Sequence, residues 1–266
     1  MPFVRYSSLR NRRSLALAGA IVLVLILLMA MGLRSERDRT PAIPTLTQSQ
    51  EITLGLKAVP ALVARYGDLS ANSEQQQTLQ RVGQHLVTSS AADKAGWRFT
   101  FRLLAEPNRI DAYALPGGQI FITTALFNRM QTEGQLAAVL AHQIAHVTGR
   151  HAAKQLKAEG LTAVLVAGED AQEGAPIDAL VSEVVNLTYS TADERAADTE
   201  ALRIMSMAGY DPNAMLGVLR VLANAYYAGA DVAYFTTHPN AADRVAYIQQ
   251  AIAALYPDGV PESLSE

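Results

Sequence analysis

The sequence predicts a mainly helical α+β domain that follows one N-terminal transmembrane helix. Residues 14–33 form an uncharged, strongly apolar run of the length that crosses a bilayer as a helix. Apolar residues then recur at helical spacing before residue 88 and after residue 124. Between residues 97 and 123 they alternate with polar residues, as in half-buried strands. The strands are few, so we expect a small sheet within a helical domain.

Composition excludes several classes of function. The chain has 266 residues, half of them apolar, which is enough to bury one sizeable core. Its length allows one or two domains. Its net charge is −3, and basic and aromatic residues do not cluster as a nucleic-acid-binding surface requires. The absence of cysteine excludes disulfides, thiolate zinc sites, a catalytic cysteine and a lipoprotein-type anchor. We therefore expect no nucleic-acid partner.

The charges around residues 14–33 indicate an orientation in the membrane. The preceding segment, residues 1–13, carries only basic charges, whereas the basic residues that follow are mixed with acids; the flanking charges are Arg5, Arg10, Arg12 and Arg13 before, and Arg34, Glu36, Arg37, Asp38 and Arg39 after. This bias favours a cytoplasmic N-terminus and an extracytoplasmic (periplasmic) domain. A cleaved signal peptide is the alternative, but its apolar region is usually shorter, and Ala30 and Gly32 make a weak cleavage site. We favour an uncleaved single-pass anchor in the cytoplasmic (inner) membrane.

A short linker and two helices come next. Residues 34–47 are polar and contain Pro41 and Pro44, as expected of a spacer between the membrane and a domain that spans residues 48–266. Helical periodicity runs over residues 48–66 and from Ser73 to about residue 88, with Ser73 as the predicted N-cap.

The strand region predicts one half-buried strand and one hairpin. Residues 97–103 alternate, with the aromatic residues on one face and Arg98, Thr100 and Arg102 on the other. Two further strands, residues 111–115 and 119–123, flank Pro116-Gly117-Gly118, which predicts a glycine turn.

The rest of the chain is predicted to be helical. Thr123 or Thr124 can cap a short helix to residue 130. The expected helices after it span residues 133 to about 160, 161–167, 176–189, 192–209, 212–228 and 239–256. Residues 168–174 form a polar loop of the kind found beside clefts.

The predicted helix from residue 133 carries the pattern that points most directly to chemistry. It contains His142-Gln-Ile-Ala-His146, whose two histidines lie four residues apart and can present two imidazole nitrogens to one tetrahedral metal. This is the spacing of HExxH, in which a Glu after the first histidine takes a proton from water activated by the metal. Here that position is Gln143, so the ligand pair is present and the base is not.

A second helix offers carboxylates at the same spacing. Glu194 can supply a third, oxygen ligand, and Asp198, one turn later, can accept the spare N–H of a ligand imidazole. A solvated acidic face is the alternative interpretation, and it suits Asp193 and Glu200 better.

With these motifs placed, the chain resembles the M48 family of membrane-linked zinc metallopeptidases, the family of HtpX, Ste24 and Oma1, from about residue 48 to the C-terminus. The likeness is strongest to bacterial extracytoplasmic members with a single soluble domain. The motifs that carry it are Ala112-Tyr-Ala-Leu-Pro-Gly-Gly-Gln-Ile-Phe-Ile, the histidine helix, Asp193-Glu-Arg-Ala-Ala-Asp198 with Gly209-Tyr-Asp-Pro212, and Thr237-His-Pro239 followed by Arg244.

The resemblance implies a zincin-like fold, a metalloendopeptidase activity and a set of site residues. One zinc ion per chain would be bound by His142, His146 and Glu194. His238 matches a family histidine near the metal, where it could donate a hydrogen bond to the developing oxyanion, although a lone His before Pro is more often a helix-cap residue.

The resemblance also places the strand before Pro-Gly-Gly at the sheet edge along the cleft. There it would bind an extended polypeptide main chain to main chain through Asp111, Ala112, Tyr113 and Ala114. Asp111 departs from the family, which more often has Asn at this position. The resemblance therefore does not define the substrate contacts that this residue would make.

Three other residues carry weaker expectations. Arg244 either holds a carboxylate of the site or lies on the surface. His151 has no partner at ligand spacing and is expected to support the site from outside the ligand set or to lie on the surface, and His85 is expected to be structural.

Gln143 leaves two functions open. A carboxamide can hydrogen-bond the water at a metal but cannot take its proton, and losing a positioned base typically costs about 10²–10⁴-fold in rate. The chain is then either a protein quality-control endopeptidase with a disabled base, through a deliberate or recent Glu-to-Gln change, or a natural pseudo-protease that captures extended polypeptide as a chaperone or adaptor. A helical domain without metal would require Glu194, Asp198 and His238 all to be coincidental.

Overall fold

The computed structural model describes residues 45–165, 175–238 and 244–265, which belong to one compact unit beginning at Pro44. The predicted anchor at residues 14–33, most of the predicted linker and the predicted loop at residues 168–174 lie outside the described residues. Within the described ranges, none of the helices combines the length and apolar character that a membrane span requires.

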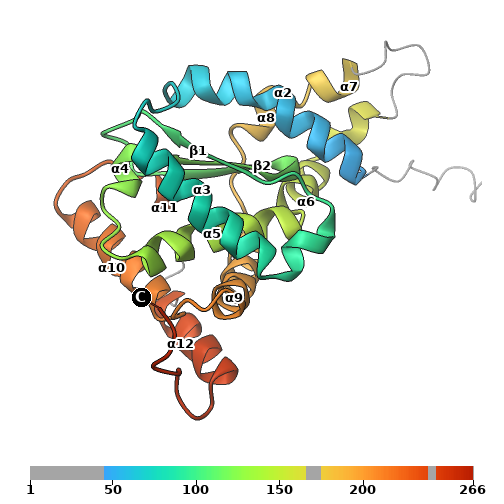
Figure 1. The fold of residues 1–266 in the computed structure, drawn as a ribbon. Helices are drawn as coiled ribbons and strands as arrows, with labels where there is room; N and C mark the ends of the chain where they lie inside the picture. Colours follow the sequence, from blue (N-terminus) through green and yellow to red (C-terminus); the bar gives the residue numbers. More distant parts are fainter. Residues whose placement is uncertain (1–44, 166–174, 239–243, 266) are drawn as a thin grey trace, which may run out of the picture. The chain divides into compact units, whose positions relative to one another are not determined.

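The described chain is mainly helical, with a small sheet near its middle (Figure 1). The strands are β1 (Thr100–Leu104), β2 (Ala112–Leu115) and β3 (Gln119–Thr123). The α-helices are α2 (Gln48–Tyr66), α3 (Ser73–Thr88), α4 (Thr124–Phe127), α5 (Glu133–Thr148), α6 (His151–Ala158), α7 (Ala175–Asp178), α8 (Val181–Val184), α9 (Thr191–Met207), α10 (Ala214–Tyr227), α11 (Tyr234–Thr237) and α12 (Arg244–Leu255). Short 3₁₀ segments are η1 (Ala91–Ala95), η2 (Pro116–Gly118) and η3 (Leu161–Leu165).

The sheet has the strand order β1-β3-β2. The predicted hairpin is confirmed, since β2 pairs antiparallel with β3 and Tyr113 lies opposite Phe121. The first strand begins at Thr100, later than the predicted residue 97, and runs parallel to β3. β2 therefore lies at an edge of the sheet, as the family resemblance implies.

The hairpin turn fits against α2 with almost no space between the two backbones. A Cβ atom on Gly117, whose φ is 78°, would lie 2.4 Å from the Cα of Ile52. A Cβ atom on Gly55 of α2 would lie 1.8 Å from the carbonyl oxygen of Pro116. Glycine is thus required on both sides of the contact, which fixes the end of the edge strand relative to α2.

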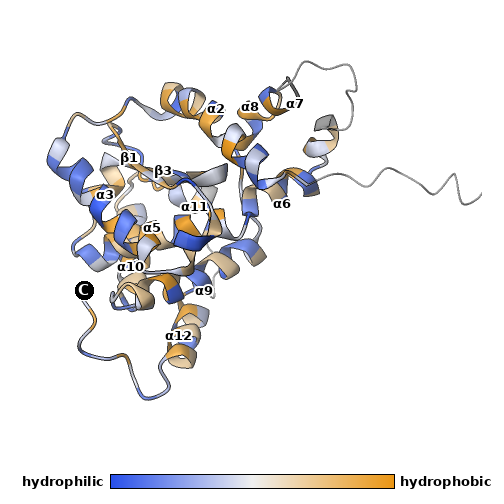
Figure 2. Cartoon of the chain, turned by 45° about the vertical axis from the view of Figure 1, so that its right-hand side comes forward, coloured by the Kyte–Doolittle hydropathy of each residue, from blue (hydrophilic) through white to orange (hydrophobic). Residues whose placement is uncertain are grey.

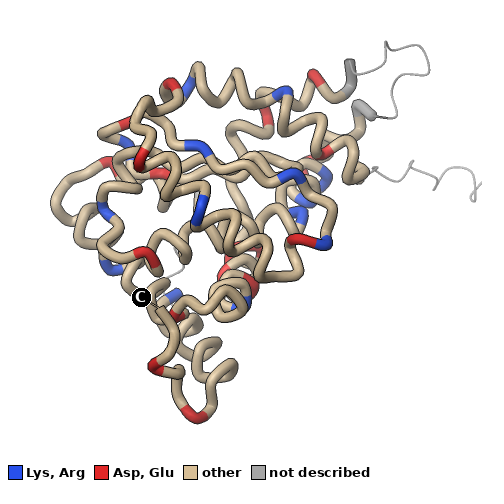
Figure 3. The backbone as a smooth tube through the Cα atoms, in the orientation of Figure 1, with Lys and Arg blue, Asp and Glu red and all other residues tan. Residues whose placement is uncertain are grey.

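Helices cover the sheet on two faces, with α2 on one side and α5 on the other (Figure 1). Alternation along β3 divides its side chains between them, so Ile120 and Ile122 join the cluster around α5. Phe121 joins the cluster around α2. Apolar and polar residues both appear around the outer helices (Figure 2), and acidic and basic residues are interspersed along the chain (Figure 3).

The prediction of one helix from residue 133 to about residue 160 was wrong. α5 ends at Thr148, and Arg150 takes a left-handed conformation with φ of 56° before α6 begins. The Nε of Arg150 donates to Glu51 Oε1 at 2.6 Å, and its Nη2 donates to the carbonyl of Leu46. These contacts with the N-terminal segment hold a conformation that a non-glycine residue rarely adopts, so local sequence gave no sign of it.

Other helix predictions also needed correction. The chain from residue 176 to 189 forms only the short helices α7 and α8, and its last residues are not helical. Val184, Val185 and Tyr189 are buried in the cluster around α2, so tertiary packing overrides their helical spacing. Asn72, rather than Ser73, caps α3 by accepting from Gln75 N at 3.1 Å.

Replacing Arg150 by Met should destabilise the domain by roughly 3 kcal/mol, the lower end of the cost of breaking a buried ion pair. Glu51 is 1% exposed, and the variant leaves its carboxylate without a cation while keeping an unbranched side chain at residue 150. Burial raises the pKa of Glu51 and Arg150 opposes that rise, so the pKa should climb further in the variant. A carboxyl with a raised folded-state pKa loses its stabilising contribution as pH increases, so the deficit should be larger at about pH 8 than at about pH 5.

Urea unfolding of both proteins at the two pH values measures this deficit. Arg203→Met is the matched control, because the Arg203–Glu200 pair has exposed side chains and its loss should cost less than about 1 kcal/mol. Equal effects of the two substitutions would contradict the assigned role of Arg150.

Candidate metal centre and substrate cleft

α5 presents His142 and His146 on one face, and the structure brings their Nε2 atoms to 3.0 Å from each other. Both side chains are 1% exposed. The helix is buried along nearly its whole length because it packs between the sheet on one side and α3, α9 and α10 on the others. The two histidines are therefore fixed by a helix that has little freedom to move.

α9 places a carboxylate against this pair. Its N-terminus is capped by Ser190, whose side chain accepts from Asp193 N, and the first turn positions Glu194. Glu194 Oε2 lies 3.5 Å from His142 Nε2, and Glu194 Oε1 lies 3.4 Å from His146 Nε2. The three side chains that the sequence singled out thus meet at one point.

The spacing of these atoms fits a metal ion. Ligand atoms about 2.0–2.1 Å from a tetrahedral zinc lie about 3.3 Å from one another, close to the three separations above. Both carboxylate oxygens of Glu194 are buried and lack a hydrogen-bond donor with acceptable geometry. A buried carboxylate in that condition is costly unless it has a cation to bind, so the donor set suits a divalent metal such as zinc.

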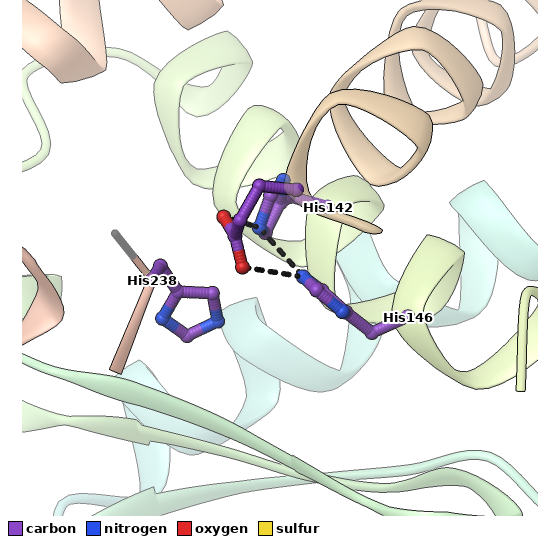
Figure 4. A group of neighbouring side chains, drawn as sticks. His142, His146 and His238 are labelled. Carbon is purple, nitrogen blue, oxygen red and sulfur yellow. Dashed lines mark hydrogen bonds and ion pairs between the residues drawn. The ribbon is translucent and has the colours of Figure 1, made fainter. Parts of the chain in front are cut away.

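A third histidine completes the cluster from the opposite direction. His238 follows α11, is 2% exposed and points toward the α5 pair, as Figure 4 shows. One nitrogen from each histidine and one oxygen of Glu194 all lie within 4.8 Å of each other. His238 is thus close to the position that a metal bound by the other three side chains would take.

Burial and ion pairing set the protonation of the cluster. Burial lowers the pKa of His146 to about 4, with partial opposition from Glu194. Burial also lowers the pKa of His238 well below its usual value. For Glu194 burial acts to raise the pKa, but the histidines around it hold it well below the usual range. A neutral His146 beside an ionised Glu194 has the protonation that ligands require, whereas for His142 burial acts to lower the pKa but Asp198 and Glu194 raise it, so a metal there would have to displace a proton.

Gln143 contacts His238 of the cluster and is completely buried. Its Nε2 is 3.0 Å from His238 Nε2, while its Oε1 has no hydrogen-bond partner. The amide donates to a neutral His238, so residues 143 and 238 are coupled directly. A carboxamide with an unsatisfied buried oxygen is consistent with a position shaped to interact with a further polar group.

Asp198 supports His142 from behind. Its Oδ1 lies 2.9 Å from His142 Nδ1, the arrangement predicted from the four-residue spacing. Arg244 binds the same carboxylate with two parallel bonds, Nε to Oδ2 at 2.9 Å and Nη2 to Oδ1 at 2.8 Å, and Tyr247 also donates to Oδ2. Burial acts to raise the pKa of Asp198, but Arg244 and His142 hold it well below the usual range. The expectation that Arg244 holds a carboxylate of the site is confirmed, and the alternative of a surface position is wrong.

His151 supports the second histidine. It is 2% exposed, its Nδ1 lies 3.0 Å from His146 Nδ1, and its Nε2 lies 3.8 Å from Asp193 Oδ1. The surface alternative for His151 is therefore wrong, and Asp193 is more than a solvated acid. His85, by contrast, is exposed and contacts the carbonyl of Ala208 at 2.9 Å, a structural bridge from α3 to the end of α9.

Aromatic residues of the site were missed by sequence analysis. Tyr189 stacks on His146 with ring centroids 4.1 Å apart, and Tyr234 stacks on His238 at 4.3 Å. Neither tyrosine belongs to a motif, and Tyr189 lies in a stretch for which a helix was predicted. Tyr247 had a usable signal, because it follows Arg244 by three residues and so shares its helix face.

A cleft of about 190 Å³ runs along the edge strand toward the cluster. One wall is β2 and the other is residues 184–189, with His238 among the lining residues. Because Tyr113 pairs inward with Phe121, the main-chain groups of Ala112 and Ala114 face the cleft. Ala112 N donates to Asp111 Oδ1 at 2.9 Å, and Tyr189 donates to Ala114 O at 3.4 Å.

Comparison with known proteins identifies the family. Residues 73–252 match the sequence profile of peptidase family M48, which covers more than half of the chain. The chain belongs to peptidase family M48. That family consists of metallopeptidases, so the metal-compatible cluster and the enzyme class agree.

Several curated proteins are similar to this family member. A Vibrio cholerae relative is 30% identical over 220 residues, which is 77% of this chain and 45% of that protein. The beta-barrel assembly-enhancing protease of Escherichia coli (strain K12) is 28% identical over 64% of this chain and 37% of its own length. The mitochondrial metalloendopeptidase OMA1 of Schizosaccharomyces pombe is 30% identical over 73% of this chain and 58% of its own length. The chain thus spans about half the length of these relatives.

Asp198→Asn should weaken metal binding by roughly 10–100-fold, the usual effect of losing a group that orients a ligand histidine. The change keeps the side-chain shape but removes the charge of Asp198, which is 0% exposed and contacts both His142 and Arg244. Competition with a coloured chelator measures the zinc dissociation constant. Glu200→Gln on the exposed face of the same helix is the control and should leave affinity unchanged; an unchanged affinity in Asp198→Asn would contradict the support role.

Proposed function

We propose that this chain is a membrane-anchored zinc metalloendopeptidase domain that acts on extended segments of misfolded or membrane-associated proteins in protein quality control. The single observation that supports this most strongly is the meeting of His142, His146 and Glu194 at tetrahedral spacing beside an edge-strand cleft. With Gln143 in place of the Glu that serves as general base, the chain hydrolyses peptides at a strongly reduced rate.

In this proposal some residues bind the substrate main chain and others orient the metal ligands. The outward groups of Ala112 and Ala114 pair with the substrate main chain, with Asp111 and Tyr113 beside them, which places the scissile carbonyl near the histidine cluster. Zinc, when bound, polarises that carbonyl and makes water more acidic. Asp198 and His151 keep the two ligand imidazoles oriented. A neutral His238 that accepts at Nε2 from Gln143 carries its proton on Nδ1, and in this proposal that N–H donates to the oxyanion.

Gln143 limits the reaction at one step. Its amide can hold a water molecule by a hydrogen bond but cannot accept a proton from it near neutral pH. A chain that keeps the metal ligands but lacks the base would bind a substrate and release it more often than cleave it. The second candidate function therefore rests on the same residue: a zinc-binding pseudo-protease that captures extended polypeptide as a chaperone or adaptor.

Gln143→Glu should raise peptide hydrolysis by roughly two to four orders of magnitude, the usual worth of a positioned base. The restored carboxylate would replace the buried amide beside His238 without adding a zinc ligand. Both proteins should therefore hold about one zinc per chain, and Glu194→Ala should lose it. Elemental analysis and a fluorogenic peptide assay provide the measurements.

The outcomes of this comparison are distinct. A large gain supports the endopeptidase, and no gain with zinc retained transfers support to the capture function. Absence of metal from both proteins, with no further loss in Glu194→Ala, contradicts both functions. Glu200→Gln provides a control for nonspecific effects of a changed carboxylate on α9.

The membrane anchor remains a proposal supported by residues 14–33 and their flanking arginines. A reporter fused after Thr47 that works only outside the cytoplasm should be active, and a cytoplasm-only reporter should be silent. The reverse pattern would show that the flanking charges give the wrong orientation. Release of the domain from washed membranes without protease would instead support a cleaved signal peptide.

A further inference from the structure

One side of the cleft, formed by the end of α2 together with Arg109 and Tyr113, carries a positive charge on Arg65 that no nearby carboxylate among the described residues balances. The side chains of Arg65, Tyr66, Arg109 and Tyr113 all line the cleft. Tyr66 and Tyr113 stack with centroids 4.6 Å apart, and each of the two guanidinium carbons lies 5.3 Å from the Tyr66 ring centroid. None of the residues that line the cleft is Asp or Glu.

The two arginines differ in how their charge is used. Arg109 lies 3.4 Å from Asp111 Oδ2 and 3.8 Å from Asp231 Oδ2, and its Nε donates to the hydroxyl of Tyr113. Among the residues that the structure describes, no carboxylate lies within ion-pair distance of Arg65. Arg65 is also exposed, so its charge is available to a bound ligand.

Strand geometry determines which substrate side chain meets this wall. A segment added antiparallel to β2 hydrogen-bonds to Ala112 and Ala114, so its residue opposite Tyr113 forms a non-hydrogen-bonded pair, in which cross-strand side chains approach most closely. Tyr113 projects to the α2 side of the sheet, where it stacks on Tyr66. The neighbouring substrate side chains project to the other side, toward α5.

We propose that the cleft selects extended polypeptides with an acidic side chain, Glu or Asp, at the position opposite Tyr113, and that Arg65 is the specificity-determining residue. Tyr66 holds the Arg65 guanidinium over its ring, so the planar fork is oriented before substrate arrives and can pair with a carboxylate. Arg109, already engaged by two acids, positions Tyr113. This inference names the substrate class of the proposed peptide-binding site and rests on that function.

Peptides of equal length test the proposal, each with a single Glu, Gln or Lys moved along an otherwise constant apolar and small sequence. Fluorescence anisotropy gives the dissociation constant with the chain as it exists, and Gln143→Glu gives kcat and KM. At one peptide position Glu should bind about 5-fold tighter than Gln and roughly 10-fold or more tighter than Lys, the worth of one solvent-accessible ion pair gained or repelled. The preference should shrink as salt rises from about 0.05 to 0.5 M.

Variants at Arg65 determine whether that residue is responsible. Arg65→Gln should abolish the preference, and Arg65→Glu should invert it so that Lys binds more tightly than Glu. Arg220→Glu, an exposed position on α10 outside the cleft, makes the same change in net charge and should leave the preference intact. An effect on KM with little change in kcat separates recognition from damage to the metal centre.

Failure of this inference and failure of the proposed function give different results. Equal cleavage of Glu, Gln and Lys peptides by Gln143→Glu overturns the acidic preference and leaves the peptidase intact. Selective binding without cleavage supports the preference and removes the peptidase. No binding of any peptide, or a preference that survives Arg65→Glu, overturns the inference.

Discussion

The candidate metal centre depends on the contacts of one buried carboxylate, that of Asp198, with His142 and Arg244. This carboxylate joins His142 of α5 to Arg244 of α12 from its own position on α9, so three helices far apart in sequence converge on one charge. A carboxylate and a guanidinium cost several kcal/mol each to remove from water, and the cost is recovered only when every bond is well formed. The two parallel bonds between Arg244 and Asp198 satisfy both carboxylate oxygens, although Arg244 Nη1 has no hydrogen-bond partner among the described residues, and they hold the carboxylate that contacts His142.

The substrate side of the molecule depends on a different constraint, the close fit between α2 and the hairpin turn. Gly55 and Gly117 leave no room for a Cβ atom at that contact, and so set the position of the edge strand along the helix. The same helix carries Glu51, which is paired with Arg150 at the end of the metal-site helix. α2 is therefore the element that ties the cleft to the metal centre, and it directly follows the segment proposed to lead to the membrane.

Gln143 separates two properties that usually occur together in such a site. The side chains that could hold a metal are together, whereas the group at the position of the proton-accepting base is an amide. Because His238 lies within hydrogen-bonding distance of that amide, a charge introduced at residue 143 would also change the protonation of residue 238. In the proposed reaction, turnover therefore depends on residue 143 together with its histidine neighbour.

Sequence by itself determined the features that depend on short-range periodicity. The four-residue spacings of His142 with His146 and of Glu194 with Asp198 fix neighbours on a helix face, and the Pro-Gly-Gly turn fixes a hairpin, whatever the remaining fold. Motif resemblance identified the family and the edge position of β2. Only the tertiary structure decided that Arg244 binds Asp198, that His151 supports His146 and that Tyr189 leaves its predicted helix to stack on a ligand histidine. The tertiary structure also decided the helix break at Arg150, because a left-handed residue held by a distant carboxylate has no signal in the neighbouring sequence. Contacts between segments far apart in the chain form only when the core packs.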